Sequence, residues 1–185
     1  GGQFATRLWW ALTYYGHDKV SVLDGGWNRW VEEDRPIESG PVAALPKVFT
    51  PRPRPGMRLT AGQLAARLGE PGLQLLDARD AGQFTGARRR GARGGHIPGA
   101  RNVPWGKAVD PASHTFRSAD ELRALYERDQ GLTPADDVVT YCRIGERSSH
   151  SWFVLTYLLG YRTVRNYDGS WTEWGNGVGL PIERP

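Results

Sequence analysis

One stretch constrains the fold of this chain more than any other, because it places a lone cysteine between a strand and a helix. Residues 138–141, Val-Val-Thr-Tyr, are a β-branched and aromatic run that predicts a buried strand. Cys142, the only cysteine among 185 residues, follows directly. Apolar residues at helical spacing then run from Trp152 to a stop at Gly160. The order strand, loop, helix is typical of an α/β fold with a parallel sheet, in which ligands bind beyond the carboxyl ends of the strands.

The loop after Cys142 predicts an anion site around an activated thiol. Backbone N–H groups of such a loop and of the following helical turn converge on bound anions. Arg143 and Arg147 add two positive charges. Both effects favour the nucleophilic thiolate, so we expect the pKa of Cys142 to be depressed to about 6–7. Ser148 is the expected N-cap of the helix.

Two other interpretations of this loop are a buried structural cysteine and a cysteine phosphatase. A lone cysteine is often a small buried hydrophobe, but such a residue has no need of two arginines and a glycine in its own loop. Cysteine phosphatases share the layout and have Cys-x5-Arg spacing. Here Arg147 gives Cys-x4-Arg and Ser148 occupies the phosphatase arginine position, so the loop is one residue too short.

The run from Cys142 to Arg147, Cys-Arg-Ile-Gly-Glu-Arg, resembles the active-site loop of the rhodaneses, the thiosulfate sulfurtransferases. Three other stretches resemble that family in the right order: Leu75–Arg79 as the preceding strand, Gly95–Ala100 as the upstream signature, and Tyr167–Gly175 as the closing motif. The resemblance implies a catalytic domain over residues 59–185, built as a rhodanese-like open parallel sheet with helices on both faces.

The resemblance also implies the site and its chemistry. Cys142 would carry the sulfur as a persulfide, with no cofactor and no metal. The substrate-binding loop would comprise Arg143, Ile144, Gly145, Glu146, Arg147 and Ser148, among which Glu146 is given no chemical role. Candidate supporting residues beside the loop are Asp77, Arg79 and Gln83. We interpret the Asp77 and Arg79 pair as structural rather than catalytic. Gln83 departs from the family, where a basic residue often stands.

The expected reaction moves the sulfane sulfur of thiosulfate through Cys142 to cyanide or a thiol acceptor. No second cysteine is available, so the acceptor must come from outside the chain. Arg143 favours a compact dianion, because thiosulfate oxygens can accept a bidentate guanidinium. Two alternatives stay open: a 3-mercaptopyruvate sulfurtransferase, and a non-catalytic persulfide-binding module that regulates a partner.

A repeat organises the rest of the chain. The pattern Val-x3-Asp-Gly-x-Trp-x2-Trp occurs at residues 20–30 and again at 164–174, an offset of 144. Residues 1–40 are therefore predicted to be the latter part of an inactive N-terminal rhodanese-like domain. We expect residues 1–33 to pack on the second domain or against a missing N-terminal segment. Within this part we expect a helix over 3–15, a strand over 20–23 and a brief helix from Trp27. The helix would bury the face formed by Phe4, Leu8, Ala11, Leu12 and Tyr15.

Proline spacing and capping signals complete the outline. Residues 41–58 are the predicted linker, because repeated prolines exclude a helix or a central strand. Strands are expected over 73–77, 100–103 and 163–167. Capping boxes are expected at Thr60 with Gln63, Ser118 with Glu121 and Ser170 with Glu173.

Composition limits the partners. A net charge of +4 suits small anions and gives no support for nucleic-acid binding. No apolar run approaches the ~18 residues of a membrane span, and the four histidines lack metal-ligand spacing. A free thiol fits a reducing compartment, so we expect a cytoplasmic protein. His96, within Gly-His-Ile-Pro-Gly, is expected to hydrogen-bond its own turn.

Overall fold

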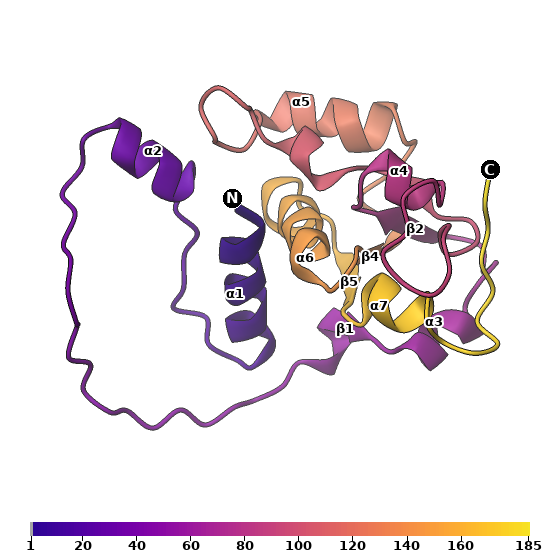
Figure 1. Cartoon of the computed structure of the whole chain (residues 1–185), viewed down its shortest axis with the longest axis horizontal. Coiled ribbons are helices and arrows are strands. Elements are labelled where there is room, and N and C mark those ends of the chain that lie inside the picture. The colour runs from indigo at the N-terminus through magenta and orange to yellow at the C-terminus, as the bar shows by residue number, and fades with distance from the viewer. Residues whose placement is uncertain (1) are drawn as a thin grey trace.

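The computed structural model describes residues 2–185 and is organised around one five-stranded sheet (Figure 1). The strands are β1 (Arg58–Leu59), β2 (Leu73–Asp77), β3 (Arg101–Asn102), β4 (Asp137–Tyr141) and β5 (Thr163–Tyr167). Every paired neighbour is parallel, in the order β1-β5-β4-β2-β3. This confirms the predicted α/β fold, and the strands expected over 73–77 and 163–167 have those bounds.

Helices are short and cover both faces of the sheet. They are α1 (Gly2–Tyr14), α2 (Gly26–Glu32), α3 (Ala61–Ala66), α4 (Ala81–Phe84), α5 (Ala119–Arg123), α6 (Glu146–Phe153) and α7 (Ser170–Trp174). Wider π-helical turns, η3 (Ala124–Arg128) and η4 (Val154–Leu158), extend α5 and α6, while η1 (Pro55–Met57) and η2 (Trp105–Ala108) are 3-10 turns. Among residues 2–185, no helix is long and apolar enough to cross a bilayer.

The sheet separates two hydrophobic cores, because successive residues of a strand point to opposite faces. Leu76 of β2 belongs to the core that contains Trp10 of α1 and Trp152 of α6. Its neighbour Leu75 belongs to the other core, with Leu64 of α3 and residues of α7. Burying one such side chain contributes about 1.5–3 kcal/mol, so both layers hold the carboxyl end of β4 in place.

Helix α1 lies along α6 (Figure 1), and Trp9 of α1 contacts aromatic residues of α6. The Trp9 ring meets Phe153 edge-on at 5.2 Å, and Trp9 Nε1 donates to Val20 O at 3.1 Å. The predicted buried face of α1 was therefore wrong. Its buried residues are Thr6, Trp9, Trp10 and Thr13, whereas Phe4 and Leu8 are 67% and 63% exposed. The indoles carry more apolar area than the other side chains, so they decide which face turns inward.

The predicted strand over residues 20–23 was also wrong, since this segment is irregular. A strand needs ladder hydrogen bonds to a neighbour, and within residues 2–185 these four residues pair with none. Helix α2 does form where a helix was expected from Trp27. Residues 35–54 form neither helix nor strand, in agreement with their prolines. Figure 1 shows most of this segment running outside the rest of the molecule, and it returns where Arg52 N and Arg54 N donate to Tyr15 O and Tyr14 O. The domain boundaries 1–40, 41–58 and 59–185 stay a prediction.

Two of the three predicted capping boxes form. Thr60 with Gln63 and Ser118 with Glu121 make both reciprocal hydrogen bonds. The third was wrong, because the Ser170 hydroxyl donates to Tyr167 O at 2.9 Å instead of capping α7.

Candidate active site

Cys142 lies directly beyond the carboxyl end of β4, and α6 begins four residues later, at Glu146. Its Sγ accepts a hydrogen bond from Gly145 N at 3.2 Å, and the Ser148 hydroxyl lies 3.6 Å from it. Gly145 has φ of +92°, which favours glycine, and an ideal Cβ there would lie 2.5 Å from Asp168 Oδ1. Ser148 was wrongly predicted as the N-cap. It lies inside α6, where its hydroxyl faces the sulfur.

The prediction of a depressed thiol pKa was wrong. Complete burial raises the pKa of Cys142, and the carboxylate of Glu146, 3.5 Å from Sγ, raises it further. Backbone N–H groups of Ser148 and Ile144 and the Ser148 hydroxyl lower this pKa but do not offset the burial. The free cysteine is therefore held as a thiol. The sequence could not reveal the burial of Cys142, which depends on tertiary packing, although Glu146 is only four residues away.

The two loop arginines occupy different environments. Arg143 is exposed, whereas Arg147 is partly buried. Arg147 Nη1 donates to Gln83 Oε1 at 3.2 Å, and its Nε lies 3.6 Å from Glu146 Oε1. Gln83 is thus brought to the loop, as the resemblance implied, but as an uncharged partner. Ile144 is 49% exposed at the loop surface.

Helix α7 holds the nucleophile loop from the neighbouring strand. The Ser170 hydroxyl accepts from Cys142 N at 3.1 Å, Trp171 N donates to Cys142 O at 3.0 Å, and Thr172 N donates to Arg143 O at 3.0 Å. Ser170 has a φ of +53°, a strained value for a residue with a Cβ. The sequence analysis did not predict these contacts between α7 and the loop. The sequence feature that could have indicated them is a serine at the turn after β5, because β5 pairs with β4.

Asp77 and Arg79 form a fully buried ion pair next to Trp171 of α7. Arg79 Nε lies 2.9 Å from both carboxylate oxygens, and Nη2 donates to Gly95 O at 2.8 Å. The guanidinium carbon lies 4.4 Å from the Trp171 ring centroid. The pair ties β2 to α7 and to the turn at Gly95. This arrangement agrees with a structural interpretation.

Arg93 and His96 also have structural partners. Arg93 donates to the carbonyls of Trp174, at 2.9 Å, and Leu180, at 2.8 Å, which fastens the C-terminal segment. His96 Nδ1 lies 3.0 Å from Phe84 O, and the two rings stack at 3.7 Å. His96 thus bonds within the fold as expected, although to α4 rather than to its own turn.

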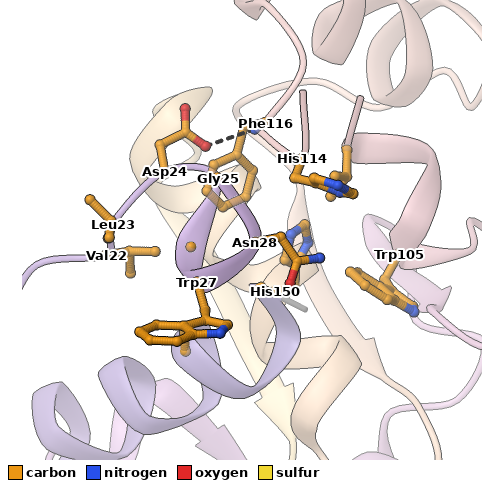
Figure 2. Close-up of a pocket in the computed structure, with 14 residues that line it drawn as sticks. Val22, Leu23, Asp24, Gly25, Trp27, Asn28, Trp105, His114, Phe116 and His150 are labelled. Carbon is orange, nitrogen blue, oxygen red and sulfur yellow. Dashed lines mark hydrogen bonds between the residues drawn. The ribbon is translucent and has the colours of Figure 1, made fainter. Parts of the chain in front are cut away.

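A cavity of about 300 Å³ opens elsewhere, between the α2 region and residues near η2 and α6 (Figure 2). Figure 2 shows Trp27 on the left and Trp105 and His114 on the right, with Asn28 and His150 between them. His150 also lines it and is fully buried, and neither ring nitrogen has a hydrogen-bond partner within the described residues. Burial lowers the pKa of His150 to about 3. None of the lining residues belongs to the loop of Cys142.

Comparison with known proteins places these features in a family. The chain is 46% identical to the sulfur carrier protein TtuD of Thermus thermophilus, covering 98% of this chain and 67% of that protein. It is 43% identical to a Mycobacterium bovis protein named "Putative thiosulfate sulfurtransferase 1", covering 97% of this chain and 67% of that one.

Solved structures agree with the fold. The chain matches EanB, crystallised with a cysteine persulfide and ergothioneine, with a TM-score of 0.87 and 27% identity, over 100% of this chain and 46% of that one. An anaerobic ergothioneine biosynthesis enzyme from Chlorobium limicola, bound to trimethyl histidine, gives a TM-score of 0.87 and 28% identity, over 98% of this chain and 45% of that one. The family model for the rhodanese-like domain matches residues 60–176. The chain belongs to the rhodanese-like family.

Proposed function

We propose that this protein is a sulfurtransferase that accepts the sulfane sulfur of thiosulfate on Cys142 and passes it to cyanide or a thiol. The observation that carries the proposal is the position of Cys142. It lies at the carboxyl end of a central parallel strand, with the N–H of Gly145 3.2 Å from its sulfur and the first turn of α6 directly behind.

The reaction would proceed in two displacements at sulfur. The Cys142 thiolate attacks the outer sulfur of thiosulfate, the sulfur–sulfur bond of thiosulfate breaks, and sulfite leaves with the electron pair. The resulting persulfide would be stabilised by the N–H groups of the loop. A cyanide or thiolate acceptor then takes the outer sulfur and regenerates Cys142. Two half-reactions through one covalent intermediate give ping-pong kinetics.

Charge supports an anionic donor. Arg143 is exposed at the mouth of the loop, where its planar guanidinium can pair with sulfonate oxygens. Arg147 lies beside Gln83 and Glu146, so its charge is partly balanced. Mercaptopyruvate, a monoanion, is the alternative donor and is included in the test below.

A second function is favoured by the name of one relative. The Thermus thermophilus protein, 46% identical, is named a sulfur carrier protein. A carrier would form the same Cys142 persulfide but hand it to an acceptor protein rather than turn over with small molecules. This version of the proposal retains the chemistry and changes only the acceptor. A module that binds persulfide without transferring it is the remaining alternative.

Intact mass spectrometry tests the proposal. Incubation with thiosulfate should add one sulfur atom, ~32 Da, to the wild type, and cyanide should remove it with release of thiocyanate. Cys142→Ser should show neither change while retaining its fold by circular dichroism. A wild type that gains no sulfur from thiosulfate or mercaptopyruvate would refute sulfur transfer. Stoichiometric loading without multiple turnovers would favour the carrier.

A further inference from the structure

The position of Glu146 is not explained by the loop's anion-binding role. Glu146 is the first residue of α6 and only 8% exposed, and its Oε2 lies 3.5 Å from Cys142 Sγ. A carboxylate at a helix N-terminus is favourable by charge, but it gains the same benefit when it points into water. A buried carboxylate beside the nucleophile instead opposes both the thiolate and the dianionic substrate.

We propose that Glu146 is the general base that takes the proton of the Cys142 thiol when the sulfur donor reacts. The inference rests on the proposed sulfur transfer and adds to it a residue with a defined chemical role. The thiol–carboxylate contact provides the geometry, since a base must lie within hydrogen-bond reach of the proton that it removes, and a sulfur donor allows a longer contact than oxygen does.

The step balances without an external oxidant or reductant. The S–H bond of Cys142 breaks and its proton passes to Oε2 of Glu146. The sulfur lone pair forms a bond to the outer sulfur of thiosulfate, whose sulfur–sulfur bond breaks with the electron pair leaving on sulfite. The proton on Glu146 then passes to the departing sulfite as hydrogensulfite. Cys142 ends as a persulfide anion and Glu146 as a carboxylate.

The charge of the substrate explains why the proton would move when thiosulfate binds. The proton neutralises Glu146 as the dianion arrives, which removes a like charge beside the reacting sulfur. The other charged groups of this region include the exposed Arg143 of the loop and Arg147 of α6, whose Nε lies 3.6 Å from Glu146 Oε1. An ion pair between Arg7 of α1 and Asp168 lies beside Gly145.

The test measures two quantities in Glu146→Gln: the pH dependence of Cys142 alkylation, which reports the thiolate fraction, and the rate of persulfide formation. Removing the carboxylate should lower the pH at which iodoacetamide alkylates Cys142, because Glu146 raises the pKa of this thiol. The rate of persulfide formation in a single turnover with thiosulfate near neutral pH should nevertheless fall about 100-fold, a typical contribution of a general base. Glu146→Asp should recover part of the rate, and the exposed Glu70→Gln should match the wild type.

Each result separates this inference from the proposed function. If Glu146→Gln forms the persulfide as fast as the wild type or faster, Glu146 only restrains the thiolate, and its role as a base is refuted while sulfur transfer stands. If the wild type itself gains no sulfur, the proposed function fails before Glu146 is tested. Circular dichroism of each variant confirms that the comparison is made between folded proteins.

Discussion

The chain contains the same local pattern twice, and the two copies end in different surroundings. The first copy, residues 2–32, and the second copy, residues 146–176, are related by the offset of 144 residues. Both begin with a helix, α1 or α6, and both end with a Trp-x2-Trp helix, α2 or α7. Between them, the second copy contributes β5 to the sheet, whereas residues 20–23 of the first copy are irregular. Local sequence thus specifies the helices, while the strand requires a neighbour to pair with.

Burial differs as strongly as pairing does. Trp171 of the second copy is 1% exposed and lies in the core with α3, whereas the equivalent Trp27 is 63% exposed at the rim of the cavity. The helices α1 and α6 pack on one another through equivalent positions, since Trp9 and Phe153 occupy matching places in the two copies and touch. The repeat therefore produces a pseudo-symmetric contact at this point.

The turn before the last helix shows what the second copy gains. Gly26 and Ser170 are equivalent and have similar positive φ values of 56° and 53°. Glycine adopts this conformation without strain, whereas serine is strained by its Cβ, at a cost of about 1–3 kcal/mol. Ser170 uses its hydroxyl to accept from Cys142 N. The strained serine is thus found in the copy that holds the nucleophile.

The largest expected effect tests the difference in burial. Trp171→Ala should lower the free energy of unfolding by roughly 3–5 kcal/mol, because it leaves a large cavity in the core. The equivalent change Trp27→Ala should alter it by less than about 0.5 kcal/mol, because the indole is mostly exposed. Urea denaturation of both variants measures this. Equal losses would show that the first copy is buried in solution and would break the comparison.

A smaller effect on stability is expected at another pair of equivalent positions, Thr6 in the first copy and His150 in the second. The Thr6 hydroxyl donates to Gly2 O at 2.9 Å, whereas His150 is buried without a partner and has a pKa lowered to about 3. As the pH falls below the unfolded-state pKa of about 6.5, the unfolded chain binds a proton that the folded chain refuses, so stability is lost with acid. Between pH 8 and pH 5 this loss should be roughly 2 kcal/mol.

His150→Phe should remove that part of the pH dependence. Phenylalanine can occupy the same place between Trp105 and Phe116, whose rings lie 5.2 Å and 4.9 Å from the imidazole. Unfolding free energies at both pH values, measured for the wild type and the variant, provide the test. An unchanged slope would show that His150 takes up its proton over the same pH range in the folded and the unfolded protein, contrary to its burial.

Sequence patterns correctly predicted the elements that depend on neighbouring residues. They failed for features that depend on residues far away along the chain. The strand over residues 73–77 and the site of Cys142 follow from apolar runs and breakers that lie next to one another. Residues 20–23 have the same kind of pattern, but their state depends on a partner strand. The capping signal at Ser170 was present, but the chain uses that hydroxyl for Cys142 N, which lies 28 residues away.

The chemistry of the loop was harder to predict than its position. Arginine and amide groups were visible in the sequence and favour the thiolate, but the burial of Cys142 and its contact with Glu146 act in the opposite direction. The burial, which is the larger effect, comes from packing that spacing along the chain does not encode. Glu146 is only four residues from Cys142, but the sequence does not show that its carboxylate turns toward the sulfur. The contribution of the first copy to the loop region, through Arg7, had no signal in the sequence, because its partner Asp168 is 161 residues away.

Arg7 offers the finest test of the comparison, because it asks whether the first copy affects the site in the second. Its guanidinium pairs with Asp168, and an ideal Cβ on Gly145 would lie 2.9 Å from Arg7 Nη1. Arg7→Gln should change stability by less than about 1 kcal/mol, since the pair is partly exposed. It should leave the negative charge of Asp168 unbalanced beside the loop, which weakens binding of dianionic thiosulfate about fivefold at low salt and less at high salt.

Asp168→Asn in the Arg7→Gln background should restore the KM, and the double-mutant cycle measures the coupling. A KM that is unchanged in Arg7→Gln, at any salt concentration, would show that the first copy packs against the site without influencing its charge.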